Sequence, residues 1–251
     1  MALPQSPLVL IPARLASTRL PDKPLADICG EPMILHVWRR ALEADIGPVA
    51  VAAGDPEIVE VVEAAGGQAV LTDPDHPSGS DRIFEALQRL DPDGRVDAVV
   101  NVQCDVPTLE PEAIRAVIRP LVEPEVDIGT IAAEIVDPSE RSDPNAVKAA
   151  IAFPAGRGIA RALYFSRAPV PWDGGDPTRP LYHHIGLYAF RRAALESFVE
   201  LPHSPLEERE KLEQLRAMEA GLRIDVALVD TSPLTVDTPD DLERARSLLA
   251  G

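Results

Sequence analysis

The sequence is poor in the features of disulfide-bonded, secreted and membrane-spanning proteins. Its 251 residues include only two cysteines, Cys29 and Cys104, which form neither a C-x-x-C pair nor a spacing typical of metal ligands. No apolar run reaches the roughly 18 residues that a membrane span requires, and no secretory signal begins the chain. We therefore expect reduced thiols and a cytoplasmic protein that has no membrane as a partner.

Positive charge is also scarce. The chain has 24 lysine and arginine residues against 41 aspartate and glutamate residues, which gives a formal net charge of −17. A general nucleic-acid binder needs a basic face, so we expect no nucleic acid as a partner. An anionic small molecule can still bind where cations are gathered locally.

Cations gather in one stretch near the N-terminus, LVLIPARLASTRLPDKPL, at residues 8–25. Leu8 to Ile11 has the length of a buried strand, and Pro12, which lacks a backbone N–H, is expected to end it. The cations and hydroxyl donors of the following loop are Arg14, Ser17, Thr18, Arg19 and Lys23. Open α/β sheets bind ligands at the carboxyl ends of strands, so this loop suits a polyphosphate. A solvated surface loop whose cations offset nearby acids is the alternative.

Strand and helix signals alternate along the first half of the chain. Strands are expected at residues 8–11, 48–53, 68–72 and 97–103, and helices at residues 31–44, 56–65, 80–90 and 111–121. This alternation predicts βαβ units, and therefore an α/β, Rossmann-like fold with a mostly parallel sheet.

The pattern changes in the second half. Strands are expected at residues 127–135, 145–153, 181–190 and 224–229, and helices at residues 204–220 and 240–249. Few helical signals separate the first three of these strands, which indicates an inserted antiparallel subregion. We expect a single domain over residues 1–251 with this insertion at about residues 137–203.

Two aspartates stand where ligands of a cation are expected. Asp105 follows the apolar strand that ends at Gln103, and Asp237 follows the short segment 234–236. A carboxylate just past a strand end, beside a cationic loop, is well placed to hold Mg²⁺ against phosphate oxygens. The residues themselves favour this role for Asp105 and a helix-capping turn for Asp237.

The stretch IPARLASTRLPDKPL resembles the opening motif of the 3-deoxy-manno-octulosonate cytidylyltransferases, and later segments agree in order almost to the C-terminus. The resemblance implies a fold of the nucleotide-diphospho-sugar transferase type. It implies a reaction of CTP with 3-deoxy-manno-octulosonate (Kdo), which gives CMP-Kdo and pyrophosphate for lipopolysaccharide biosynthesis. It also implies Mg²⁺ as the cofactor and a homodimer, with the inserted subregion serving sugar binding or dimerisation.

The resemblance also assigns the metal ligands. VDTPDDLERAR, at residues 236–246, is similar to the closing motif of the family, whose first aspartate binds metal together with the aspartate of a Q-G-D-E-P motif. That second motif reads Gln103-Cys104-Asp105-Val106-Pro107 here, so it departs from the family at Cys104 and Val106. The implied catalytic residues are Arg14, Lys23, Asp105 and Asp237, of which Asp105 and Asp237 are the metal ligands.

A third motif is expected at the nucleotide. Ser78-Gly79-Ser80-Asp81-Arg82 resembles the S-G-T-E-R of the family, and a glycine before free helix N–H groups suits an anion or a carbonyl acceptor. An ordinary capped helix is the alternative. The residues expected to bind CTP are Pro12, Ala13, Arg14, Arg19, Lys23, Ala53, Gly54, Asp55, Ser78, Gly79, Arg82 and Gln103.

Further motifs imply the sugar site. The matching segments are ALYFSRA at 162–168, PWD at 171–173, HHIGLY at 183–188, SPLE at 204–207 and LEQLR at 212–216. The resemblance implies that the sugar is bound by Gln103, Arg167, His184, Tyr188, Glu213 and Gln214. A guanidinium suits the sugar carboxylate, and the other groups suit hydroxyls. By periodicity alone, Glu213 and Gln214 belong to the wet face of a helix.

Two alternative functions stay open, of which only the second is suggested by the departures at 104 and 106. One is a cytidylyltransferase for another acidic sugar, such as 8-amino Kdo or a sialic-acid-like sugar, and another is a non-catalytic nucleotide-binding paralogue. The retained cations and aspartates argue against the paralogue. Valine at 106 offers no counter-charge to an ammonium, so it favours Kdo over the 8-amino sugar if its side chain lies at the sugar site. Cys104 has no local feature that would make it a nucleophile.

Overall fold

The computed structural model describes residues 2–17, 19–172, 174, 176 and 178–250. Thr18 of the cationic loop and Asp173 of the PWD segment lie outside these residues. The chain forms two compact units. The split unit consists of Gln5–Arg115 and Pro233–Gly251, and the central unit consists of Ala116–Ser232 with the first four residues. The single domain with an insertion at about 137–203 stays a prediction.

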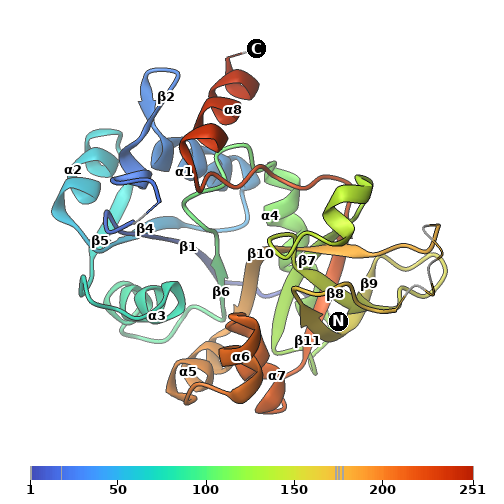
Figure 1. Cartoon of the computed structure of the whole chain (residues 1–251). Coiled ribbons are helices and arrows are strands. Elements are labelled where there is room, and N and C mark those ends of the chain that lie inside the picture. The colour runs from blue at the N-terminus through green and yellow to red at the C-terminus, as the bar shows by residue number, and fades with distance from the viewer. Residues whose placement is uncertain (1, 18, 173, 175, 177, 251) are drawn as a thin grey trace. The chain divides into compact units, whose positions relative to one another are not determined.

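The split unit contains a parallel sheet with strand order β5-β4-β1-β6 (Figure 1). Its strands are β1 (Pro7–Ala13), β4 (Val49–Ala53), β5 (Gln68–Leu71) and β6 (Ala98–Asn101). Side chains of β1, β4 and β6 are buried on both faces, as expected of parallel strands covered by helices. The helices that pack on this sheet are α1 (Met33–Ala44), α2 (Pro56–Ala64) and α3 (Gly79–Leu90).

Strand β1 continues through Pro12, so the expected strand end at this residue is wrong. The N–H of Val9 donates to the carbonyl of Pro48 beside β4, so the nitrogens of even-numbered residues face β6. The pairing with β6 ends where Leu10 meets Asn101. Pro12 lies beyond that point. No carbonyl of β6 therefore needs a hydrogen bond from residue 12, and the strand tolerates the missing N–H.

The central unit contains a mixed sheet with strand order β10-β7-β11-β9-β8. Its strands are β7 (Ile128–Glu134), β8 (Lys148–Ile151), β9 (Ile159–Ser166), β10 (Tyr182–Arg191) and β11 (Ile224–Val229). Strand β11 is parallel to β7, whereas β10 is antiparallel to β7 and β9 is antiparallel to both β11 and β8. The α/β class is confirmed. The sheet of the split unit is parallel, as expected, whereas that of the central unit is mixed, with β7 and β11 as a parallel pair.

Two elements of the central unit differ from expectation. Strand β9 and helix α5 (Arg192–Glu200) were not expected, and the helix expected at 204–220 is divided into α6 (Pro205–Glu210) and α7 (Gln214–Glu219). The division occurs at Lys211, whose φ is +56°. Arg167 donates to the carbonyls of Glu210 and Lys211, which a continuous helix would have used internally.

The remaining elements are short. They are β2 (Asp27–Ile28), β3 (Glu31–Pro32), α4 (Pro111–Val117) and the 3₁₀ helices η1 (Lys23–Leu25), η2 (Arg119–Val122) and η3 (Pro138–Arg141). None of the helices in the described ranges combines the length and apolar composition that crossing a bilayer requires.

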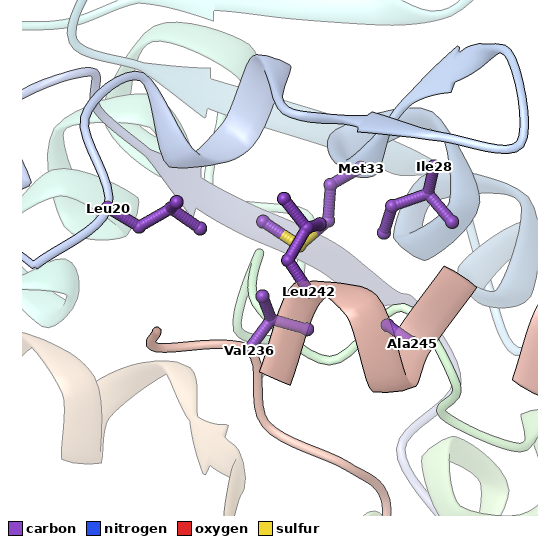
Figure 2. Close-up of a cluster of buried hydrophobic side chains, with 6 residues drawn as sticks. All are labelled: Leu20, Ile28, Met33, Val236, Leu242 and Ala245. Carbon is purple, nitrogen blue, oxygen red and sulfur yellow. The ribbon is translucent and has the colours of Figure 1, made fainter. Parts of the chain in front are cut away.

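The C-terminal helix α8 (Pro239–Leu249) packs beside the β2–β3 hairpin (Figure 1). Thr238 caps it through a capping box with Asp241, as expected of Thr238 from the sequence. Figure 2 shows the apolar cluster that fixes it, in which side chains from the N-terminal and C-terminal parts of the split unit meet. The cluster consists of Leu20, Ile28, Met33, Val236, Leu242 and Ala245.

Candidate active site

A pocket of about 400 Å³ lies in the split unit at the carboxyl ends of β1 and β6. It brings together most of the residues expected to bind CTP and both expected metal ligands. These lining residues are Pro12, Ala13, Arg14, Arg19, Lys23, Ser78, Gly79, Arg82, Gln103, Asp105 and Asp237. Segments that are more than 200 residues apart in sequence therefore meet at one place, as a ligand site at a sheet edge requires.

An ammonium joins the two aspartates. Nζ of Lys23 lies 2.6 Å from Oδ2 of Asp105 and 3.0 Å from Oδ1 of Asp237. Nη2 of Arg19 lies 3.1 Å from Oδ2 of Asp237. Burial acts to lower the pKa of Lys23, but the charges and hydrogen bonds of the two carboxylates outweigh it and raise that pKa above its usual value. Lys23 is therefore held as a cation.

Hydrogen bonds between the segments that carry Asp105 and Asp237 keep the two aspartates next to each other. The N–H of Val236 donates to the carbonyl of Asp105 at 2.8 Å, and the N–H of Leu234 donates to Oγ1 of Thr108 at 3.0 Å. Val236 is fully buried in the cluster of Figure 2, so the residue before Asp237 is anchored by packing as well. The carboxylates of Asp105 and Asp237 consequently stand at fixed positions on the pocket wall.

Ala53, Gly54 and Asp55 do not line the pocket but support it from behind. Oδ2 of Asp55 accepts the N–H of Leu15 at 2.8 Å, and the N–H of Gly54 donates to the carbonyl of Ala13 at 2.8 Å. These bonds attach the end of β4 to the start of the cationic loop. The contact of Ala53, Gly54 and Asp55 with CTP stays a prediction. In the structure, Gly54 and Asp55 support the loop that carries Arg14.

Arg82 lines the pocket, but its guanidinium is committed to the protein. Only 2% of the residue is exposed, and Nη1 donates to Oγ1 of Thr72 at 2.7 Å and to the carbonyl of Asp73 at 2.9 Å. Nη2 donates to the carbonyl of Pro74 at 3.1 Å. Burial, and then the charge of Arg14, lowers the pKa of Arg82. Arg82 therefore fixes the loop that precedes α3.

His76 lies on the same loop and lines the pocket, although sequence reasoning did not single it out. Its Nε2 contacts the carboxylate of Glu85, which also accepts the N–H of Asp73 at 2.9 Å. A histidine two residues before the SGSDR segment was the available signal. Ala16 and Cys104 were likewise not expected to line the pocket, and Ser17 was expected only as a donor.

The thiol of Cys104 is not a nucleophile. Its burial, and then the charge of Asp105, raises the pKa of the thiol to about 12. The thiolate is the reactive form, so this thiol is inert near neutral pH. The raised pKa agrees with the expectation that this thiol does not act as a nucleophile.

Five of the six residues expected to bind the sugar belong to the central unit, and Gln103 belongs to the split unit. His184 is 6% exposed, with Nε2 at 3.0 Å from Oγ1 of Thr130. Burial, and then the charge of His183, lowers the pKa of His184 to about 3, so its imidazole is neutral. Burial, and then the charge of Glu213, raises the pKa of Tyr188, whose ring packs against His184.

Gln214 and Arg167 differ in their remaining hydrogen-bonding capacity. Nε2 of Gln214 is buried and has no hydrogen-bond partner within the described part of the chain. Arg167 donates from Nε to the carbonyl of Glu210 at 2.7 Å and from Nη1 to the carbonyl of Pro144 at 3.0 Å. Gln103 donates to Oδ1 of Asn101 at 3.2 Å. The sugar-binding roles of these residues stay predictions.

Known proteins resemble the chain over nearly its full length. A family model described as cytidylyltransferase matches residues 8–224. The 3-deoxy-manno-octulosonate cytidylyltransferase of Paramagnetospirillum magneticum is 62% identical over 97% of this chain and 98% of its own. The protein of the same name from Rhodospirillum centenum is 64% identical over 99% of this chain and 95% of its own.

A solved structure agrees with these relatives. It is that of a CMP:2-keto-3-deoxy-manno-octonic acid synthetase complexed with CTP, with a TM-score of 0.88 and 38% sequence identity. The match covers 98% of this chain and 99% of the other. The similarity therefore includes both units and all of the segments that form the pocket.

Proposed function

Because this chain belongs to the cytidylyltransferase family, and within it to the 3-deoxy-manno-octulosonate cytidylyltransferases, we propose that it activates Kdo with CTP and releases pyrophosphate. One observation carries the proposal. The pocket at the ends of β1 and β6 gathers three cations, Arg14, Arg19 and Lys23, in a protein whose net charge is −17. Such a cluster suits a triphosphate, and it lies beside two carboxylates.

The proposed reaction is a direct displacement at phosphorus. The anomeric hydroxyl of the sugar, which gives up its proton to solvent water, attacks the α-phosphorus of CTP, and the bond to the bridging oxygen of pyrophosphate breaks on the opposite side. Arg14, Arg19 and Lys23 offset the charge of the phosphates, which increases on the leaving group. Preorganised cations lower the barrier because they need no reorientation when that charge develops. No protein nucleophile takes part.

Asp105 and Asp237 fit Mg²⁺. Mg²⁺ is commonly held by one or two carboxylates together with substrate phosphate oxygens. Among the described residues no group of three or more histidine, cysteine, aspartate or glutamate side chains converges on one point, so the pair matches a site that the nucleotide completes. Mg²⁺ held there supplies charge compensation to the phosphates.

We place the acidic sugar near His184, Tyr188 and Gln214 of the central unit. The buried amide nitrogen of Gln214 lacks a partner within the described residues, and an unpaired buried donor is costly unless a ligand acceptor meets it. The neutral imidazole of His184 and the phenol of Tyr188 suit hydroxyls rather than a carboxylate. Faster release of pyrophosphate with Kdo than with acidic sugars that lack its hydroxyl pattern is the expected selectivity.

The proposal also covers the oligomeric state, the cellular location and the fold type of the protein. We infer a cytoplasmic homodimer with the nucleotide-diphospho-sugar transferase type of fold, and no partner of nucleic acid or membrane. Its support is a set of exposed apolar side chains in the central unit, Val136 (88% exposed), Leu163 (66%) and Trp172 (87%). Burial of these side chains against a second copy of the chain would remove their apolar area from water. Light scattering after gel filtration tests the dimer, which a monomeric mass would refute.

A pyrophosphate-release assay tests the activity. The protein is supplied with Mg²⁺, with CTP or UTP, and in turn with Kdo, 8-amino Kdo and a sialic acid. We expect release only with CTP, and fastest with Kdo. Faster release with another sugar would make that sugar, rather than Kdo, the proposed substrate. No release with any sugar would favour a non-catalytic nucleotide-binding paralogue.

Variants of the two aspartates test the metal assignment. Asp105→Asn and Asp237→Asn should each lower kcat by about 100-fold or more, because an amide is a poor ligand for Mg²⁺. Circular dichroism should show that the fold is retained. Full activity of either variant at limiting Mg²⁺ would refute its role as a ligand.

A further inference from the structure

One ammonium occupies the space between the two proposed metal ligands. Nζ of Lys23 is 2.6 Å from a carboxylate oxygen of Asp105 and 3.0 Å from one of Asp237. All three side chains are partly buried, with exposures of 13% for Lys23, 20% for Asp105 and 32% for Asp237. The ammonium therefore sits where a cation shared by both carboxylates would sit, and it neutralises part of their charge.

The ammonium competes with a divalent cation for the same two carboxylate oxygens, Oδ2 of Asp105 and Oδ1 of Asp237. An ion bound to the same oxygens would lie within a few ångströms of Nζ, where like charges repel strongly in a partly buried site. The carboxylates are not free to separate, because the N–H of Val236 is bonded to the carbonyl of Asp105. The lysine side chain, a flexible four-carbon stem, is the group that can move.

A triphosphate offers the ammonium a new partner. Lys23 lines the pocket together with Arg14 and Arg19, so phosphate oxygens bound there lie within the volume that a lysine side chain can reach. We propose that Lys23 is the resident cation of the Asp105–Asp237 pair in the free protein, and that it excludes divalent metal until a bound triphosphate draws its ammonium away. This inference rests on the proposed function, because it takes the aspartates as the metal ligands.

The consequence is positive coupling between metal and nucleotide. The free protein binds a divalent cation weakly, and CTP raises that affinity in two ways, by adding phosphate ligands and by removing Lys23. By linkage, metal raises the affinity for CTP by the same factor. When the charge of Lys23 is removed, the contribution of the phosphate ligands to the coupling remains, and the contribution of Lys23 is lost.

Binding of Mn²⁺ measures the effect without turnover. Free Mn²⁺ is followed by electron paramagnetic resonance in titrations of the full chain, with and without a CTP analogue whose α,β-bridge is a methylene group. Wild type is expected to bind Mn²⁺ at least tenfold more weakly without the analogue. Lys23→Met should bind Mn²⁺ at least tenfold more tightly than wild type in the absence of the analogue.

Matched variants separate a local from a general effect of charge. Lys23→Arg keeps a cation and should bind as weakly as wild type. Lys211→Met removes the same charge from an exposed residue of the central unit, and it should leave Mn²⁺ binding unchanged. In the double variant with Asp105→Asn, the gain from Lys23→Met should disappear.

The outcomes distinguish the inference from the proposed function. If Asp105→Asn and Asp237→Asn leave Mn²⁺ binding in the analogue complex unaltered, the metal assignment itself is wrong. If both weaken it while Lys23→Met and wild type bind Mn²⁺ equally without the analogue, only the resident-cation inference is overturned. Thermal unfolding of each variant verifies the fold, and Lys23→Gln replaces Lys23→Met if the latter does not fold.

Discussion

A methyl group added at Gly54 would collide with the guanidinium that holds the pocket loop. A Cβ there would lie 2.7 Å from Nη1 of Arg82, 3.0 Å from Cζ and 3.1 Å from Nη2. Atoms at such distances must separate by several tenths of an ångström. The guanidinium cannot retreat freely, because it is buried and donates to Thr72, Asp73 and Pro74.

The expected cost of Gly54→Ala follows from these contacts. Overpacking of a buried site costs about 1–3 kcal/mol, and a hydrogen bond from a charged donor is worth about 1.5–3 kcal/mol. Displacement that weakens one of the three bonds of Arg82 therefore lowers the free energy of unfolding by about 2 kcal/mol. The loop with His76 should also shift, which raises KM for CTP more than it lowers kcat.

Urea unfolding and CTP kinetics measure these two effects. Gly158→Ala is the matched control, because a Cβ at Gly158 meets no atom within 4 Å. In an Arg82→Met background, where the guanidinium is absent, the cost of Gly54→Ala should largely vanish. A change in unfolding free energy of less than about 0.5 kcal/mol, or full additivity with Arg82→Met, would refute the reasoning.

Three further predictions concern other residues. Arg14→Ala and Lys23→Ala should lower kcat/KM for CTP, with a fall in kcat, by more than they disturb urea stability; unaltered kinetics would return the loop to a solvated surface. The pKa of His184 is lower in the folded protein than in the unfolded chain. As pH falls, the imidazole therefore becomes protonated in the unfolded chain before it does in the folded protein. Wild type should therefore lose about 1.4 kcal/mol of unfolding free energy per pH unit more than His184→Gln as pH falls from about 6 to 4, and equal slopes would contradict this. Val106 is 5% exposed, so Val106→Glu should destabilise the fold by several kcal/mol rather than change sugar preference, and unchanged urea stability would contradict this.

The parallel half of the fold could be predicted because its signals are local. The apolar runs of β1, β4 and β6 lie between glycines, prolines and amphipathic helices, and each boundary is set within a few residues of chain. The strand through Pro12 could not be predicted, since it depends on where a neighbouring strand stops pairing. Strand β9 was missed because two of its four buried positions, Ala160 and Ala162, are small and favour strands weakly.

The site shows the same division between local and tertiary information. The cationic loop, Asp105 and the helix cap at Thr238 could be predicted from short motifs, and the family resemblance is confirmed by relatives more than 60% identical. The bond from Leu15 to Asp55 and the contact of His76 with Glu85 depend on packing, so no motif contains them. The preference for Kdo drawn from Val106 depended on its side chain lying at the sugar site; the side chain is buried, which no motif shows, and the preference stays a prediction.

The split arrangement of the pocket has a consequence for how the protein is made. Chains are synthesised from the N-terminus, and the earlier regions begin to fold first. The segment from Pro233 onward is translated after the rest of the pocket, yet it supplies Asp237, the bond from Val236 to the carbonyl of Asp105 and half of the cluster that packs Leu20. A nascent chain or a fragment that ends before Pro233 thus holds the phosphate cations and one carboxylate, but not the second. The pocket is therefore complete only after the segment from Pro233 onward has left the ribosome and packed against the first part of the split unit.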